Sequence, residues 1–202
     1  MEESMKGRTN QEWLDGVYGK LLAKMSAECA RLGTMIPFAP RSGKYFDVEN
    51  TPLGLHFWTN GFWPGMLWQM YHATGDESYR KAAEGVEERL EAILKSFDGV
   101  DHDAGFQFLL SAVADYRVTG SKEARRRGLH AANMLAGRYN PAGRFIRAWN
   151  DGTTEAETTA EWMKAGGGVS GWMIVDCMMN IPLANSCAKR FLCICEVSRA
   201  PS

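Results

Sequence analysis

The sequence predicts an all-α fold made of helical hairpins, in which charge-poor helices form an inner layer beneath charged outer helices. Apolar residues recur with helical spacing, and charge-poor stretches alternate with charge-rich ones. The same pair of stretches also returns, because the break at Thr74-Gly75 recurs 45 residues later at Thr119-Gly120. Repeats of one buried and one surface helix are typical of stacked hairpin arrays.

The composition supports one core and argues against two classes of partner. The 202 residues are 45% hydrophobic, which is ample for a buried interior. The net charge is -1, and its 23 basic and 24 acidic residues are mixed along the chain, so we expect neither nucleic acid nor an anionic membrane as a partner. The run Arg125-Arg126-Arg127 lies inside a helical pattern and predicts a solvated helix face.

Location and cofactors are predicted from what the sequence lacks. Residues 1–6 have no basic-then-apolar order, so we expect a cytoplasmic protein. The weakly charged stretch 165–188 contains Asp176 near its middle, which would cost roughly 3 kcal/mol in a bilayer and argues against a membrane span. Five cysteines and four histidines show no metal-ligand spacing. We therefore expect no metal and no cofactor.

The elements follow in order along the chain. Residues 11–32 carry apolar side chains every four residues and predict an amphipathic helix, and residues 34–57 predict a long loop. The stretch 61–73 has no charged side chain and predicts a helix buried nearly all round. Asp76 is expected to cap a charged outer helix with one apolar stripe that ends at Phe97.

The second unit repeats this plan, and the third is incomplete. Residues 105–118 predict an inner helix with Asp115 at its surface end, and Ser121 is expected to cap an outer helix running to about residue 139. Residues 171–183 open a third inner helix, but no break, cap or outer helix follows. We therefore expect an incomplete array of helical hairpins over residues 1–183 and an atypical tail over 184–202, produced by a frame shift or a truncation.

Two carboxylates are the candidate catalytic groups. Asp103 lies with His102 immediately before the second inner helix, where the helix dipole favours negative charge. Helix capping is the alternative for Asp103. Asp176 is flanked by apolar residues, which would raise its pKa toward the range of a general acid, and a structural bond to the backbone is its alternative.

Aromatic residues near the inner-helix starts suggest a sugar. Trp58 and Trp149 precede loops, where an indole face can stack on a sugar ring, whereas core packing is the alternative for every tryptophan. Two carboxylates on neighbouring repeats together with such rings are typical of carbohydrate-cleaving sites.

These motifs together resemble the unsaturated glucuronyl hydrolases, glycoside hydrolase family 88. The resemblance rests on five motifs in order, covering residues 10–183: Trp58-Thr59-Asn60-Gly61-Phe62-Trp63-Pro64-Gly65, Tyr71 with Thr74-Gly75-Asp76, His102-Asp103-Ala104-Gly105-Phe106, Ile146-Arg147-Ala148-Trp149 and Ile174-Val175-Asp176-Cys177-Met178-Met179-Asn180. It implies the N-terminal half of an (α/α)6 barrel of six helical hairpins, which is incomplete in this chain.

The resemblance also implies an activity and a role for each site residue. Family members remove a terminal 4,5-unsaturated uronic acid from lyase-generated oligosaccharides by hydrating its C4=C5 double bond. Asp176 matches the residue that protonates the alkene, and Asp103 matches a second essential carboxylate that holds ring hydroxyls. His102, beside Asp103, is also expected to bind the substrate, and Trp58 and Trp149 match residues that contact the unsaturated ring.

Two alternatives and one liability accompany this interpretation. A related family acts on unsaturated rhamnogalacturonan products, and a chain with a broken third repeat could also be an inactive helical-hairpin fragment. Arg147 stands where many members carry Gln, which is a departure from the family pattern. A half barrel would expose an apolar edge, so we expect self-association through that edge.

Overall fold

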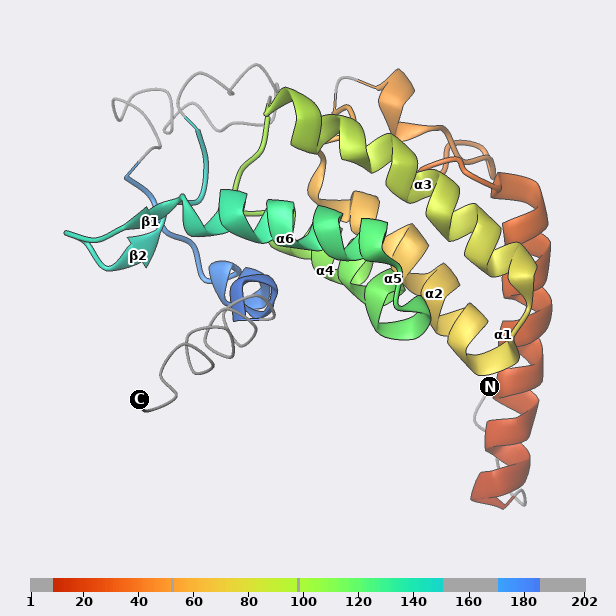
Figure 1. Ribbon diagram of the computed structural model, residues 1–202. Coiled ribbons are helices and arrows are strands. Elements are labelled where there is room, and N and C mark those ends of the chain that lie inside the picture. Colours follow the sequence, from red (N-terminus) through yellow and green to blue (C-terminus); the bar gives the residue numbers. More distant parts are fainter. Residues whose placement is uncertain (1–8, 52, 98, 151–170, 186–202) are drawn as a thin grey trace, which may run out of the picture.

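The computed structural model describes residues 9–51, 53–97, 99–150 and 171–185, and these form an array of helical hairpins with one short β-hairpin (Figure 1). The predicted all-α hairpin architecture is confirmed. Within the described ranges, no helix combines the length and the apolar character needed to cross a bilayer. Residues 186–202 of the predicted tail, 184–202, lie outside the described residues.

Helix α1, Asn10–Leu32, is packed only over its last turns. It begins with a capping box between Thr9 and Glu12 and ends at Gly33. Figure 1 shows its N-terminal half extending past the neighbouring helices. The buried residues are Met25, Cys29 and Leu32, and the exposed apolar residues are Trp13, Leu14, Val17, Tyr18 and Leu21. Self-association through exposed apolar surface stays a prediction.

The predicted long loop after α1 is tied down at its centre. It contains the short helix η2, Val48–Asn50, and a backbone bridge between Pro37 and Asp47. The guanidinium of Arg89 donates to both carboxylate oxygens of Asp47 at 2.7 Å and to the carbonyl of Thr34 at 2.8 Å. This bidentate pair fixes the loop on helix α3, Glu77–Ser96.

The first hairpin has the predicted break and cap. Helix α2, Phe62–Thr74, follows the short helix η3, Trp58–Gly61, and ends where Gly75 takes a φ of 72°. Asp76 then caps α3 by accepting a hydrogen bond from the Ser78 amide at 2.9 Å. A left-handed residue followed by a carboxylate cap reverses the chain in two residues.

Burial differs from the sequence prediction at two places in this hairpin. Helix α2 is not buried all round, because Phe62 and Met66 remain 39% and 47% exposed on a face that the described helices leave uncovered. Phe97, predicted to end the apolar stripe of α3, is 63% exposed, because it adopts a φ of 62° at the C-cap and leaves the helical register.

The second inner helix is divided. It forms α4, Ala104–Leu110, and α5, Ala112–Thr119, which meet at Ser111 with a φ of -100° and a ψ of -96°. The outer helix α6, Lys122–Ala136, starts at its predicted cap Ser121. The second inner segment is one residue longer than the first. Its starting glycine, Gly105, comes 44 positions after Gly61, but its terminal glycine, Gly120, comes 45 positions after Gly75. The division accommodates this additional residue.

Buried charges join the outer helices, which the sequence did not indicate. Asp115 is 2% exposed rather than a surface residue, because α5 packs against α6. Arg127 is also buried and donates from Nε and Nη2 to Glu91 at 3.1 and 3.0 Å, so this member of the arginine run is not solvated. Glu87 is 1% exposed and accepts a 2.7 Å hydrogen bond from the indole of Trp68.

The last described segments complete the third unit in part. After α6 come β1, Tyr139–Asn140, and β2, Phe145–Ile146, which pair antiparallel. The predicted third inner helix begins later than residue 171, because only residues 177–185 are helical. Cys29 and Cys177 are buried free thiols.

Replacing Glu87 by Gln should remove a pH dependence of stability. Burial, with a contribution from the charge of Asp115, raises the Glu87 pKa from 4.5 to about 8. The unfolded chain then loses this proton at lower pH than the folded one, so the free energy of unfolding falls as pH rises from about 4.5 to about 8, by about 5 kcal/mol at most. Urea unfolding at about pH 5 and pH 8 should show that the free energy of unfolding changes less with pH in Glu87→Gln than in the unaltered chain. The same pH dependence in both chains would refute this assignment.

Candidate active site

Asp103 and Asp176 occupy equivalent positions in two consecutive inner helices. In the segment 101–105, the amides of residues 104 and 105 bond the carbonyls of residues 101 and 102 at 3.4 and 3.2 Å. In the segment 174–178, the amides of residues 177 and 178 bond the carbonyls of residues 174 and 175 at 3.1 and 3.2 Å. Each carboxylate is therefore the last residue before its helix.

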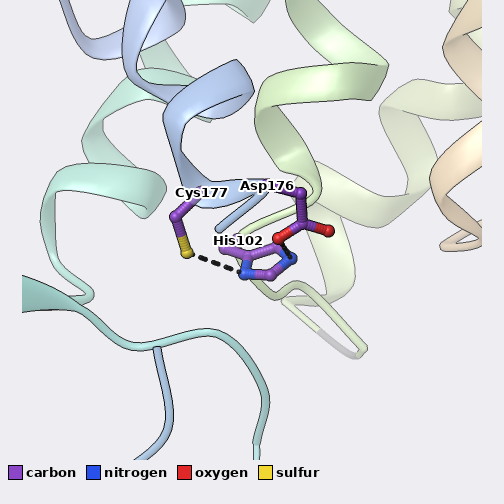
Figure 2. A group of neighbouring side chains, drawn as sticks. All are labelled: His102, Asp176 and Cys177. Atoms are coloured by element: carbon purple, nitrogen blue, oxygen red, sulfur yellow. Dashed lines mark hydrogen bonds and ion pairs between the residues drawn. The ribbon is translucent and has the colours of Figure 1, made fainter. Parts of the chain in front are cut away.

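His102 lies between the two carboxylates and a thiol. Its Nε2 atom is 2.8 Å from Asp103 Oδ1 and 3.7 Å from Asp176 Oδ1. Its Nδ1 atom is 3.3 Å from the sulfur of Cys177, so the acid and the thiol approach opposite edges of the ring (Figure 2). Because the side chain is 0% exposed, the imidazole is placed to hold both carboxylates. This conformation does not support the direct sugar contact expected from the sequence.

The charges of this group shift one another's pKa values. Burial alone would lower the pKa of His102, but the neighbouring carboxylates of Asp103, Asp101 and Asp176 outweigh it and the pKa is raised. Burial raises the pKa of Asp176, the imidazole opposes that shift, and Asp103 adds to it. The protonation states of His102 and Asp176 therefore depend on each other and on the neighbouring charge of Asp103.

Asp101 supports the turn and was not a predicted site residue. Its Oδ1 atom accepts a 2.8 Å hydrogen bond from the amide of Asp103. Burial and the charge of Asp103 raise the pKa of Asp101 to about 6. Asp103 itself makes no side-chain capping bond to α4, so capping, the alternative for this residue, is not observed. The Asp-x-Asp spacing was the available signal for the turn.

A buried arginine forms the framework of the site. Arg138 donates from Nε to the carbonyl of Arg147 at 2.8 Å and from Nη2 to that of Ala148 at 2.9 Å. Its Nη1 atom donates to the Val100 carbonyl at 3.1 Å and to Asn150 Oδ1 at 2.8 Å. These bonds join the segments before α4 and after β2. A lone arginine at the end of a helix gives no sequence signal for such a role.

The framework positions one of the two predicted tryptophans beside His102. The amide of His102 donates to the carbonyl of Ala148 at 3.1 Å, and the ring centroid of the following Trp149 lies 6.2 Å from that of His102. Trp58 belongs to an adjoining aromatic cluster, with centroids 5.8 Å from those of both Phe62 and Phe106. Phe106 lies one turn after Asp103, so α4 connects the two groups.

Apolar flanks do not bury Asp176 as the sequence suggested. Its side chain is 41% exposed, because it precedes the helix instead of lying within it. Val175, Met178 and Met179 point outward and are 88%, 66% and 62% exposed. The carboxylate is therefore accessible to a ligand on one side and faces His102 on the other.

One group of side chains is close enough to hold an ion, although the sequence predicted no metal. Ligand atoms of His102, Asp176 and Cys177 lie within 4.8 Å of one another in the described part of the chain. Asp176 and Cys177 face different nitrogens of the same ring, however, and one ion cannot bind both nitrogens of one imidazole (Figure 2). The geometry is that of ion-pair and hydrogen-bond contacts.

Comparisons with known proteins agree with the motifs. No family model matches the chain. Unsaturated glucuronyl hydrolase from Bacillus sp. strain GL1 is 36% identical over 143 residues, which are 70% of this chain and 33% of that protein. Unsaturated chondroitin disaccharide hydrolase from Streptococcus pneumoniae is 35% identical over 62% of this chain and 29% of its own length.

A solved structure gives the same result. The crystal structure of unsaturated glucuronyl hydrolase from Bacillus sp. GL1 matches with a TM-score of 0.66 and 32% identity, over 82% of this chain and 40% of that one. The chain is related to the unsaturated glucuronyl hydrolases. The predicted resemblance is confirmed, and with it the assignment of these hairpins to the (α/α)6 architecture that it implied. The chain spans about a third of the length of the two curated relatives named above.

Replacing Arg138 by Lys should destabilise the chain. Lysine cannot reproduce four hydrogen bonds in a planar fork, and carbonyls of two segments would lose their donors, at a cost of about 3 kcal/mol. Urea unfolding measures the loss, and Arg144→Ala, at an exposed hairpin position, is the control that should change little. Equal stabilities of the two variants would contradict the framework role.

Proposed function

We propose that the chain carries the acid pair of a glycoside hydrolase that removes a 4,5-unsaturated uronic acid from lyase-generated oligosaccharides by hydrating the C4=C5 bond. One observation carries the proposal: carboxylates at the starts of two neighbouring inner helices approach the same nitrogen of buried His102. Groups so coupled can exchange a proton during a reaction. The relatedness to unsaturated glucuronyl hydrolases supports the substrate class.

The two carboxylates have separate tasks in this proposal. Asp176 is accessible and has a raised pKa, which suits a group that donates a proton to C4 and then accepts one from the water that adds to C5. The resulting hemiketal opens and releases the sugar. Asp103, 15% exposed, lies closer to the imidazole and accepts hydrogen bonds from ring hydroxyls.

The remaining predicted residues surround this pair. Trp149 adjoins His102 and is available for stacking on the unsaturated ring, and Trp58 offers a 42% exposed ring from the adjoining aromatic cluster. His102 acts through the carboxylates, because it is buried.

The relatives favour an unsaturated glucuronyl substrate over the rhamnogalacturonan alternative. The cytoplasmic location stays a prediction.

Asp176→Asn should strongly reduce the turnover of an unsaturated glucuronyl disaccharide. An amide cannot donate the proton, so the rate should fall by roughly a thousandfold, within the range usual for a general acid. Loss of the ultraviolet absorbance of the alkene measures the rate. The control is Asp15→Asn, which changes an exposed carboxylate on α1 and should leave the rate unchanged. Unimpaired turnover by Asp176→Asn would exclude it as the acid.

The pH profile should respond to the two neighbours of Asp176 in opposite directions. Turnover requires protonated Asp176, so the rate should fall as pH rises through its raised pKa. Asp103→Asn removes a charge that raises this pKa and should move the alkaline limb to lower pH. His102→Gln removes a charge that lowers it and should move the limb to higher pH. Shifts in the same direction would contradict the assignment.

A further inference from the structure

Gly105 allows an unusually close contact between α4 and the helix 177–185. A Cβ atom at this position would approach Asn180 to less than 3.0 Å, at its side chain and also at its Cα atom. The Cα atom cannot rotate away, so any larger residue would have to move the helix 177–185 as a unit. Glycine is therefore required here by packing and not by its φ angle.

The preceding pair of inner helices contains the same kind of joint. A Cβ atom on Gly61 would lie 2.6 Å from the Cα atom of Gln107. In both joints the glycine opens one inner helix and meets a buried amide residue of the next, since Gln107 is 3% and Asn180 is 0% exposed. Each joint thus fixes the start of one inner helix against the next.

Each amide residue lies four positions after a carboxylate of the site. The backbone amide of Gln107 donates to the carbonyl of Asp103 at 3.1 Å. The side-chain Nδ2 atom of Asn180 donates to the carbonyl of Asp176 at 3.3 Å. The residue that meets the glycine is therefore also bonded to the backbone of the carboxylate one turn earlier.

From these contacts we infer that Gly105 and Asn180 are positioning residues, which together set the place of the Asp176 carboxylate relative to His102 and Asp103. The Gly105–Asn180 contact fixes the helix against α4, and the Asn180 side chain fixes the first turn that carries Asp176. The catalytic consequence rests on the proposed function. The geometric consequence does not, because the separation of Asp176 from His102 exists without any substrate.

The first measurement is the pKa of His102 in the full chain, followed by NMR titration of the imidazole. The groups facing His102 are Asp101 and Asp103 before α4, Asp176 and Cys177 at the helix 177–185, and Arg138 behind Asp101. Gly105→Ala should move Asp176 and Cys177 away with their helix and leave Asp101, Asp103 and Arg138 in place, so the His102 pKa should fall because the Asp176 carboxylate no longer favours the charged imidazole. Gly65→Ala is the control, because its Cβ would come no closer than 3.1 Å to the Cβ atom of Leu110 and 3.3 Å to the carbonyl oxygen of that residue.

The second measurement separates the hydrogen bond from the bulk of Asn180. Asn180→Ser keeps a donor, because a serine hydroxyl can bond the carbonyl four residues earlier, whereas Asn180→Ala has none. If the inference holds, Asn180→Ala lowers kcat by roughly 100-fold, as expected for a displaced catalytic group, with little change in KM, and Asn180→Ser recovers part of the loss.

The outcomes distinguish the inference from the proposed function. A wild-type chain without turnover would refute the proposed function, and the His102 titration would still test the joint. An unchanged His102 pKa in Gly105→Ala, or in Asn180→Ala should Gly105→Ala not fold, would overturn the inference. Equal activities of Asn180→Ala and Asn180→Ser would exclude the Asn180 hydrogen bond as a determinant.

Discussion

The described structure depends on how closely the inner helices approach one another at their starts. Gly61 and Gly105 bring successive helices to distances that no side chain would permit, and a buried amide residue fills the space opposite each. Since the carboxylates stand one turn before those amides, the packing of the hairpins also decides where the acids lie. The same contacts therefore determine both the fold and the site, and a change of register between two hairpins would separate Asp103 from Asp176.

Electrostatics adds a second constraint to this packing. Two carboxylates that converge on one buried imidazole would repel each other without it, and the imidazole would be costly to bury without them. Arg138 stabilises the backbone around this group by donating hydrogen bonds to the carbonyls of Arg147, Val100 and Ala148. The raised pKa values of Asp101 and of the partly shielded Asp176 follow from desolvation beside the charge of Asp103, which is a common arrangement in acid catalysis.

The sequence predicted where helices begin and end better than it predicted which side chains are buried and what they contact. Local signals, such as the cap at Asp76 and the breaks at Gly75 and Gly120, are fixed by neighbouring residues and were confirmed. The division at Ser111, the burial of Asp115 and Arg127, and the role of Arg138 depend on partners far along the chain, which periodicity does not encode. Asp103, His102 and Asp176 could be singled out from their chemistry and motifs, whereas Asn180 and Cys177 could not, because their significance lies in contacts across 75 residues.

The most direct test of the account mixes the Asp176→Asn chain with an unsaturated glucuronyl disaccharide and follows the alkene proton by NMR. If Asp176 supplies the proton while Asp103 and the tryptophans hold the sugar, the alkene signal should broaden on binding yet persist without loss, and the same sample with the unaltered chain should lose it. Consumption of the alkene by Asp176→Asn, or failure of both chains to perturb its signal, would contradict the account.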